Sequence, residues 1–305
     1  MKQQKSVFEL IVTGLKIGII FAFVITCMAV YSYFNDKPSP STSTKEEPKK
    51  VVAPVKEVKD YKSWSYVLNN INFDAIKKSN YDVVIIDIET NNKLVDVETI
   101  KSLNPKKVFA YASLGQAENY RSYWKKEWNK TPPEWIGKEN RYWKDNFEIK
   151  NLMAPEWVEI SKRTVDMIIA MGYDGVLVNG LPETTQAVDF LNEIVSYIKS
   201  KKPTLSVFVQ DSENLSSDAR FMGLIDGIVK QGLIFSRLSD GTSGKVNGEE
   251  YITRTIETLK KFKQNNKQVF VVEFVSGDLY ATAKKRIEEN SFIPYSAPLT
   301  LNVLR

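Results

Sequence analysis

Short apolar runs alternate with amphipathic stretches along residues 61–305, in the repeating order that βα units produce. The apolar runs are rich in β-branched and aromatic residues, which favours strands, whereas the stretches between them repeat apolar residues at helical spacing. The expected strands cover residues 65–68, 83–88, 108–114, 175–178, 205–210, 227–230, 268–274 and 299–303. The expected helices cover residues 73–78, 98–103, 155–171, 184–201, 249–264 and 281–290.

Eight expected strands with helices between them, over about 245 residues, fit one closed barrel of parallel strands. An open, doubly wound sheet is the alternative. It is disfavoured because no Gly-rich phosphate loop follows any of the expected strands. The sequence therefore predicts the α/β class with a single (β/α)8 TIM-type barrel.

Residues 17–34 form an uncharged apolar run that is long enough to cross a hydrocarbon core of ~30 Å. Lys2, Lys5 and Lys16 precede the run and favour a cytoplasmic N-terminus. No small-residue cleavage site follows it, which favours an uncleaved signal anchor over a removed signal peptide. We therefore expect residues 1–34 to form a cytoplasmic stub and a transmembrane helix.

The composition changes to Pro, Ser, Thr, Lys and Glu from residue 35 to residue 60. This segment has too few apolar residues to fold by itself and is expected to be a disordered linker. The predicted organisation is thus an anchor over 1–34, a linker over 35–60 and a barrel over 61–305. The protein is expected to cross the cell membrane once and to hold its barrel on the extracytoplasmic side.

The composition also limits the chemistry. The chain has no His, which excludes Ser-His-Asp and Cys-His catalysis and any histidine-ligated metal. Its single cysteine, Cys27, lies in the apolar run and cannot form an intrachain disulfide. The net charge of +5 comes from residues spread along the chain, without the basic runs typical of nucleic-acid binding. Any catalysis would use carboxylates, Lys, Tyr or amides, and nothing indicates a cofactor or a required metal.

Polar residues gather where the expected strands end. The carboxyl ends of barrel strands meet at one face, so these side chains are expected to line a single polar cleft. Each one alone could equally be a helix cap or an ordinary loop residue. They are Asp87, Glu89, Ser113, Gln116, Glu118, Asn179, Gln210, Asp211, Lys230, Gln231 and Glu273.

Five of the six tryptophans lie in the long connection between the third and fourth expected strands. Flat aromatic faces beside polar groups suit sugar rings, which pack on the faces and hydrogen bond through their hydroxyls. Alternatively, most of these rings pack under the connection as a small core and only a few meet a ligand. The five are Trp124, Trp128, Trp135, Trp143 and Trp157.

The stretch Tyr-Ala-Ser-Leu-Gly-Gln-Ala-Glu-Asn-Tyr-Arg over residues 111–121 resembles glycoside hydrolase family 114, the endo-α-1,4-polygalactosaminidase-like barrels. Residues 172–179 and 226–231 are similar to two further strand motifs of that family, and the likeness covers nearly all of residues 61–305. The resemblance implies a (β/α)8 barrel and a secreted galactosaminoglycan-type polysaccharide as its substrate class.

Four amides depart from the family pattern. Gln116 and Asn119 occupy positions where the family carries Glu and Asp. Asn179 and Gln231 occupy the positions of the Asp and Glu that the resemblance implies as the acid/base pair. An amide keeps the size of a carboxylate, but it cannot donate a proton to a leaving oxygen or attack an anomeric carbon. Weak or absent hydrolysis is therefore expected unless another acid replaces them.

Asp87 and Glu183 are the candidate catalytic substitutes, with Asp211 and Glu273 as further possibilities. The expected substrate-binding residues combine the motif positions with the aromatic and polar residues of the cleft. They are Tyr111, Gln116, Glu118, Arg121, Trp124, Trp143, Asn179, Gln210, Gln231 and Glu273.

Three functions remain open from the sequence. The chain could bind the polysaccharide with little or no turnover, hydrolyse it with relocated carboxylates, or serve only as a scaffold for protein interactions. The expected partners are an α-1,4-galactosaminoglycan-type polysaccharide, the membrane through residues 17–34, and polysaccharide synthesis or export machinery. No nucleic acid is expected as a partner.

Overall fold

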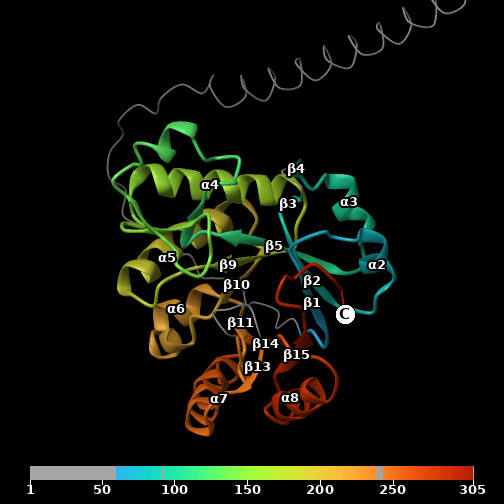
Figure 1. Ribbon diagram of the computed structural model, residues 1–305. Coiled ribbons are helices and arrows are strands. Elements are labelled where there is room, and N and C mark those ends of the chain that lie inside the picture. The colour runs from blue at the N-terminus through green and yellow to red at the C-terminus, as the bar shows by residue number, and fades with distance from the viewer. Residues whose placement is uncertain (1–59, 91–92, 238–242, 305) are drawn as a thin grey trace, which may run out of the picture. The chain divides into compact units, whose positions relative to one another are not determined.

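The computed structural model describes residues 60–90, 93–237 and 243–304, and these residues form a nearly closed (β/α)8 barrel (Figure 1). Its eight parallel strands are hydrogen bonded in the order β1-β2-β5-β9-β10-β11-β14-β15. The predicted TIM-type architecture is therefore confirmed. The strands are β1 (Trp64–Val67), β2 (Val83–Asp87), β5 (Lys107–Ser113), β9 (Gly175–Asn179), β10 (Ser206–Gln210), β11 (Gly227–Gln231), β14 (Gln268–Glu273) and β15 (Ile293–Ser296).

Helices surround the strands in Figure 1, and several of them begin at residues whose side chains cap the first turn. Asn72 and Asp96 each accept a hydrogen bond from the backbone N–H three residues later, and Thr184 does the same. Pro155 opens the long helix before β9, where its missing N–H costs no hydrogen bond. The helices are α2 (Phe73–Lys78), α3 (Val97–Ser102), α4 (Pro155–Ala170), α5 (Thr185–Lys201), α6 (Ala219–Leu224), α7 (Glu249–Gln264) and α8 (Gly277–Glu289).

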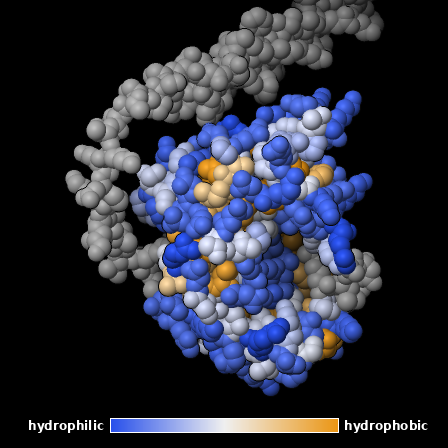
Figure 2. Space-filling model, turned by 90° about the vertical axis from the view of Figure 1, so that its left-hand side faces the viewer, coloured by the Kyte–Doolittle hydropathy of each residue, from blue (hydrophilic) through white to orange (hydrophobic). Residues whose placement is uncertain are grey.

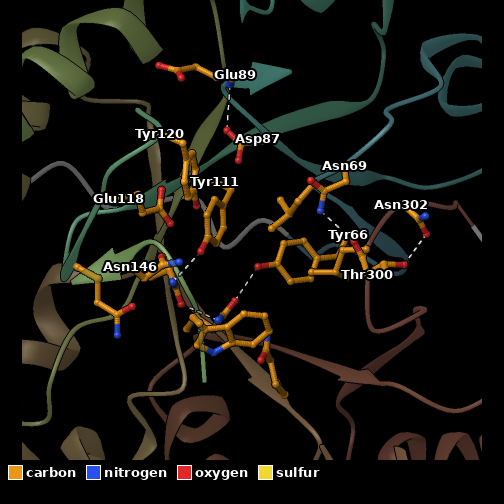
Figure 3. Close-up of a pocket in the computed structure, with 18 of the residues that line it drawn as sticks. Tyr66, Asn69, Asp87, Glu89, Tyr111, Glu118, Tyr120, Asn146, Thr300 and Asn302 are labelled. Carbon is orange, nitrogen blue, oxygen red and sulfur yellow. Dashed lines mark hydrogen bonds between the residues drawn. The ribbon is translucent and has the colours of Figure 1, made fainter. Parts of the chain in front are cut away.

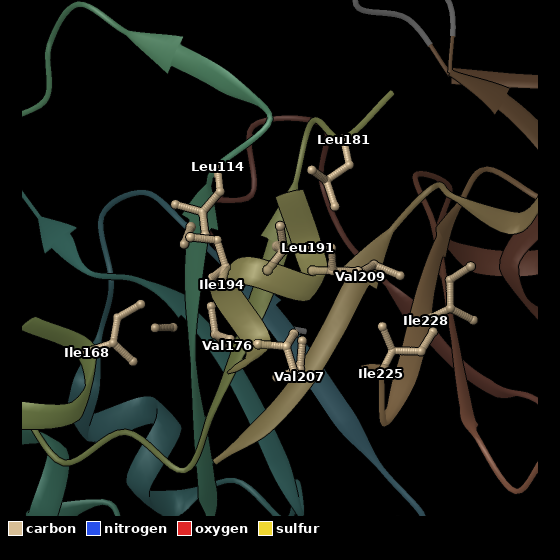
Figure 4. Packing of buried hydrophobic residues seen from close by; sticks show 14 of the residues in the cluster. Leu114, Ile168, Val176, Leu181, Leu191, Ile194, Val207, Val209, Ile225 and Ile228 are labelled. Atoms are coloured by element: carbon tan, nitrogen blue, oxygen red, sulfur yellow. The ribbon is translucent and has the colours of Figure 1, made fainter. Parts of the chain in front are cut away.

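The core has two layers because successive strand residues point to opposite faces. Val83 and Ile85 of β2 belong to the cluster inside the barrel, where the Trp64 ring stacks on Phe270 with 4.8 Å between centroids. Alternate strand residues pack outward against the helices. Figure 4 shows this outer layer between the strands β9, β10 and β11 and the helix α5, formed by Val176, Val207, Val209, Leu191, Ile194 and Ile228.

The two ends of the strand order meet through side-chain and loop contacts. Trp64 donates from Nε1 to the Ile293 carbonyl oxygen at 2.9 Å. Beyond the strands, the backbone N–H groups of Leu68 and Asn69 both donate to the Leu301 carbonyl oxygen, at 2.8 and 3.0 Å. The segment after β15 thus closes the barrel at the carboxyl end of β1.

The prediction of the last strand over residues 299–303 is wrong. The eighth strand is β15, and residues 299–303 form the loop that follows it. Pro294 disfavours a strand in the sequence, because proline has no backbone N–H to donate to a neighbouring strand. In the structure β15 is the last strand of the sheet order, so the missing N–H costs no hydrogen bond between strands. The loop contains apolar residues because it packs on the barrel interior, where Leu301 is buried. Leu301 has a positive φ of 47°. Helix α6 was also not predicted.

The predicted anchor over residues 17–34 lies outside the described residues, as does the predicted linker over 35–60 apart from Asp60. None of the helices within the described ranges is long and apolar enough to cross a membrane. Figure 2 shows one face of the described part as mostly hydrophilic, with apolar side chains in small separate patches.

Candidate functional site

A cavity of about 960 Å³ opens at the carboxyl ends of the barrel strands. Amides dominate its polar lining, together with four carboxylates and one guanidinium group, that of Arg121. The carboxylates are those of Asp87, Glu89, Glu118 and Asp211. The amides belong to Asn69, Asn70, Gln116, Asn140, Asn146, Asn179, Gln210, Gln231 and Asn302.

A chain of neutral hydrogen bonds crosses the floor of the cavity. Tyr66 donates from its hydroxyl to Gln210 Oε1 at 2.8 Å, and Gln210 Nε2 donates to Asn179 Oδ1 at 2.6 Å. Asn179 Nδ2 donates in turn to the Tyr111 hydroxyl oxygen at 2.7 Å. Figure 3 shows Tyr66 and Tyr111 directed into this space from β1 and β5. Burial, reinforced by nearby Glu118, raises the pKa of Tyr111 well above its usual value, so the chain carries no charge.

Arg121 forms a buried ion-pair cluster at one side of the floor. Its Nη1 and Nη2 contact the two oxygens of Asp87 at 2.5 and 2.9 Å, and its Nε contacts Glu118 Oε2 at 2.5 Å. Burial raises the pKa of Glu118, while the charge of Arg121 acts in the opposite direction. Burial also works against the Arg121 charge, but Glu118 and Asp87 raise its pKa above the usual value. The cluster fixes the segment after β5 against β2.

An insertion after β5 forms one wall of the cavity. It contains a three-stranded sheet in the order β6-β8-β7, made of β6 (Gln116–Glu118), β7 (Ile136–Glu139) and β8 (Asn146–Ile149), and a short 3-10 helix, η1 (Lys126–Asn129). Asn140 Oδ1 accepts from the backbone N–H groups of Tyr142 and Trp143, at 2.9 and 3.3 Å. This turn presents the Trp143 ring, which lines the cavity and is 45% exposed. Tyr120 lines the same wall with an exposed ring.

The opposite wall comes from the loops after β1 and β15, and sequence reasoning did not identify it. Asn69 Nδ2 donates to the Thr300 carbonyl oxygen at 2.9 Å, and Thr300 Oγ1 donates to Asn302 Oδ1 at 2.6 Å (Figure 3). The Asn69-Asn70 pair directly after the first predicted strand was a signal for this wall. Thr300 and Asn302 gave no such signal, because they lie within residues 299–303, whose apolar pattern predicts a strand.

The model of glycoside hydrolase family GH114 matches residues 41–304. The chain belongs to this family. An uncharacterized protein of Methanocaldococcus jannaschii is 31% identical over 265 residues, which are 77% of this chain and 75% of that protein. A protein of Thermotoga maritima is 25% identical over 272 residues, covering 78% of this chain and 80% of that protein.

Two solved structures share the fold of this GH114 barrel. The glycoside hydrolase domain of PelA from Pseudomonas aeruginosa has a TM-score of 0.65 and 12% identity, with 80% of this chain and 97% of that chain covered. Ega3 of Aspergillus fumigatus, in complex with galactosamine, has a TM-score of 0.60 and 17% identity, with 86% and 99% covered.

The cavity of the GH114 barrel contains most of the predicted site residues. The candidate substitute Asp87 lies in the lining. Among the residues predicted to bind substrate, eight lie there: Tyr111, Gln116, Glu118, Arg121, Trp143, Asn179, Gln210 and Gln231.

Three of the predicted catalytic and substrate-binding residues lie outside the lining, as do Ser113 and Lys230, which were also expected to line the cleft. Glu183 is exposed on the loop after β9, where its two oxygens accept from Asn214 N and Nδ2 at 2.8 and 2.5 Å. Glu273 is fully buried and accepts from the backbone N–H groups of Ile234 and Phe235, at 2.7 and 3.1 Å. Burial raises the pKa of Glu273 to about 7.

Trp124 is the third residue outside the lining. Its ring stacks on Phe147 with 5.1 Å between centroids and meets the edge of Trp128. Trp128, Trp135 and Trp157 are buried beneath the wall. Most of the tryptophan cluster is thus the small core that the sequence left as the alternative. Across the described ranges, no group of three or more His, Cys, Asp or Glu side chains is arranged to hold a metal ion.

Proposed function

We propose that this GH114 barrel binds a galactosaminoglycan-type polysaccharide and hydrolyses it weakly or not at all. The observation that carries the proposal is the chain of neutral hydrogen bonds across the floor of the cavity. Asn179 is engaged with Gln210 and Tyr111, and Gln231 also lies in the lining, so amides occupy both positions of the expected acid/base pair. Amides can hold sugar hydroxyls by donating and accepting, but they cannot supply the proton that glycosidic cleavage needs.

The walls of the cavity also favour a saccharide. Exposed rings of Trp143 and Tyr120 stand beside several amides, a combination that suits the apolar faces and hydroxyls of a sugar. The volume of about 960 Å³ is much larger than one solvent molecule needs, so the cavity can hold a larger ligand. A barrel used only as a scaffold would have no need of such a lined cavity.

The charge of the lining supports an amino sugar as the bound unit. Four carboxylates and the guanidinium group of Arg121 line the cavity, and Arg121 is already paired with Asp87 and Glu118. This excess of negative charge disfavours uronic acids and sulfated sugars and favours protonated amines. The complex of Ega3 with galactosamine is consistent with that preference in a protein of the same fold.

Efficient hydrolysis by the two candidate substitutes is less well supported. Both oxygens of Asp87 are held by Arg121, and Glu183 lies on an exposed loop outside the lining. A pair of carboxyl groups that flank a glycosidic bond must lie ~5–9 Å apart with their oxygens facing the bond. We retain the anchor over residues 17–34, an extracytoplasmic barrel and a polysaccharide synthesis or export complex as parts of the proposal.

The test uses the full chain, purified in detergent. Calorimetric titration with α-1,4-linked galactosamine oligosaccharides should show binding, whereas polygalacturonate of matched length should not bind. Release of reducing ends should be slow or absent.

Rapid hydrolysis that is abolished by Asp87→Asn or Glu183→Gln would replace the proposal with an active enzyme using relocated carboxylates. No affinity for any glycan would favour the scaffold. Protease treatment of intact cells separately tests whether the barrel lies outside the membrane.

A further inference from the structure

Asp211 is a cavity carboxylate with one oxygen anchored by the protein and one oxygen open. Its Oδ1 accepts from the backbone N–H of Gln231 at 2.9 Å and lies 3.2 Å from Lys230 Nζ. Its Oδ2 accepts no hydrogen bond from the residues that the structure describes. Its backbone has a positive φ of 49°, a conformation that non-glycine residues adopt rarely and often at functional positions. The backbone and the anchored oxygen therefore hold a carboxyl group whose other oxygen is available to a ligand.

The remaining carboxylates of the cavity are less able to reach a glycosidic oxygen. Asp87 has both oxygens bound by Arg121, and the side chain of Glu118 is only 2% exposed. Glu89 accepts from Ser122 Oγ at 2.8 Å, and in Figure 3 its side chain extends away from Tyr66. The side chain of Asp211, by contrast, is 35% exposed.

Burial favours the protonated form of Asp211, and the nearby cation, Lys230, does not fully offset it. Lys230, whose side chain is 9% exposed, lies between Asp211 and Glu213 and is nearer to Glu213 Oε1, at 2.7 Å. One cation shared by two carboxylates leaves one negative charge unbalanced. Partial removal from solvent raises the pKa of Asp211, while Lys230 and the backbone N–H of Gln231 oppose the shift and Glu213 adds to it. A proton on Asp211 thus persists to higher pH than on an ordinary aspartate.

We propose that Asp211 is the proton donor in a slow glycosidic cleavage within this cavity, an activity that rests on the glycan binding proposed above. Asp211 lies beside Gln231, through whose backbone N–H it is anchored, and so it borders the position from which a carboxylate is missing. The proton passes from Oδ2 to the glycosidic oxygen as the bond from that oxygen to C1 breaks, and the leaving sugar departs as an alcohol. Water adds to C1 and releases a proton to solvent, from which Asp211 is protonated again. One water is consumed and no other reactant is needed.

Two substrates separate proton donation from a structural role. An α-1,4-linked galactosamine tetrasaccharide needs a proton on its leaving oxygen, whereas the nitrophenolate of 4-nitrophenyl α-galactosaminide leaves without one. In the full chain, Asp211→Asn should lower kcat on the tetrasaccharide by about 10²-fold or more and change kcat on the nitrophenyl substrate little. Asp278→Asn, at an exposed position at the start of α8, is the matched control and should affect neither substrate. Equal losses on both substrates, or no loss on the tetrasaccharide, would overturn the inference.

The native chain provides a second measurement that does not depend on a variant folding. The ratio of turnover on the tetrasaccharide to turnover on the nitrophenyl substrate should fall as pH rises, because only protonated Asp211 assists the first reaction. A ratio that does not change with pH would contradict the role of Asp211. Binding of the tetrasaccharide without any turnover in the native chain would overturn this inference and leave the proposed binding function in place. Absence of binding would reject both.

Discussion

Gln210 Nε2 donates a hydrogen bond of 2.6 Å to Asn179 Oδ1, which joins the carboxyl ends of β10 and β9 at the cavity floor. Asn179 then donates from Nδ2 to the Tyr111 hydroxyl oxygen, so its amide accepts on one side and donates on the other. An ionised carboxylate at position 179 could only accept, and the Tyr111 hydroxyl would then have to donate to it. The direction of the hydrogen-bond chain therefore depends on the amide.

This dependence leads to a gain-of-function prediction. The double variant Asn179→Asp with Gln231→Glu should increase release of reducing ends from α-1,4-linked galactosamine oligosaccharides by about 10²-fold or more, because it restores two groups able to exchange protons with the substrate. Gln116→Glu also adds a carboxylate to the lining, but not at the expected acid/base positions, and should give no such increase. Retained binding with an unchanged rate in the double variant would show that these positions do not carry out the chemistry.

Trp143 is expected to contribute to glycan affinity through its exposed face. Trp143→Ala should weaken binding of the oligosaccharides about 2- to 13-fold, since a stacked aromatic contact is worth roughly 0.5–1.5 kcal/mol. Tyr142→Ala is the control, because this neighbouring ring is 53% exposed but does not line the cavity and lies against Arg141. Calorimetric titration measures both. Equal effects of the two substitutions would argue against a specific role of the Trp143 ring.

The barrel could be predicted from the sequence because each buried strand carries a β-branched or aromatic run that only a strand accommodates well. Seven of the strands lie within a residue or two of their expected positions. The eighth was misplaced because its run contains Pro294, whose cost depends on where the strand lies in the sheet order. Leu301 reads as part of a strand, but its burial in the barrel results from loop packing that the local pattern does not encode.

The sequence predicts the site residues that lie at the carboxyl ends of strands, but not those on long loops. Asn179, Gln210 and Gln231 end three adjacent strands, so the barrel topology alone brings them together. Residues on long loops have no such constraint. Trp124 and Trp143 both looked suited to stack on a sugar, yet Trp124 packs on Phe147 whereas Trp143 lies in the lining. Tertiary packing within the insertion makes that difference.

Arg121 is expected to be essential for stability because it balances two buried carboxylates. Arg121→Met should lower the free energy of unfolding by about 3–5 kcal/mol, since Asp87 and Glu118 would remain buried without a cation. Arg220→Met is the matched control. Its pair with Asp189 lies at the surface, so its loss should cost no more than about 1 kcal/mol. Urea unfolding measures both variants, and a similar small loss in each would contradict the importance of the buried cluster.

Glu273 should make the stability depend on pH. Its pKa is about 7 in the folded protein, against an ordinary value of 4.5, so between these values the folded state binds more protons than the unfolded state. Stability contributed by Glu273 is therefore fully present below pH 4.5 and is lost as pH rises through 7, by an amount on the order of 3 kcal/mol. Glu273→Gln should remove this dependence, whereas Glu257→Gln on the exposed side of α7 should retain it. Unfolding of all three proteins in urea at several pH values provides the comparison, and parallel curves for the native chain and Glu273→Gln would contradict it.

Gly115 allows the loop after β5 to approach the end of β9 at the edge of the cavity. Its N–H donates to the Asn179 carbonyl oxygen at 2.9 Å, and a Cβ at this position would lie 2.1 Å from the backbone carbonyl group of Gly180. Gly115→Ala should therefore destabilise the protein by about 2 kcal/mol or more and weaken glycan binding, because both backbones must move apart. Gly223→Ala tests the opposite case: its Cβ would meet no atom within 4 Å, and in helix α6 the change should stabilise the fold by about 0.5–1 kcal/mol. Thermal unfolding and calorimetric titration measure both variants. An alanine tolerated at position 115 without loss of stability or affinity would show that this close approach is not needed for the site.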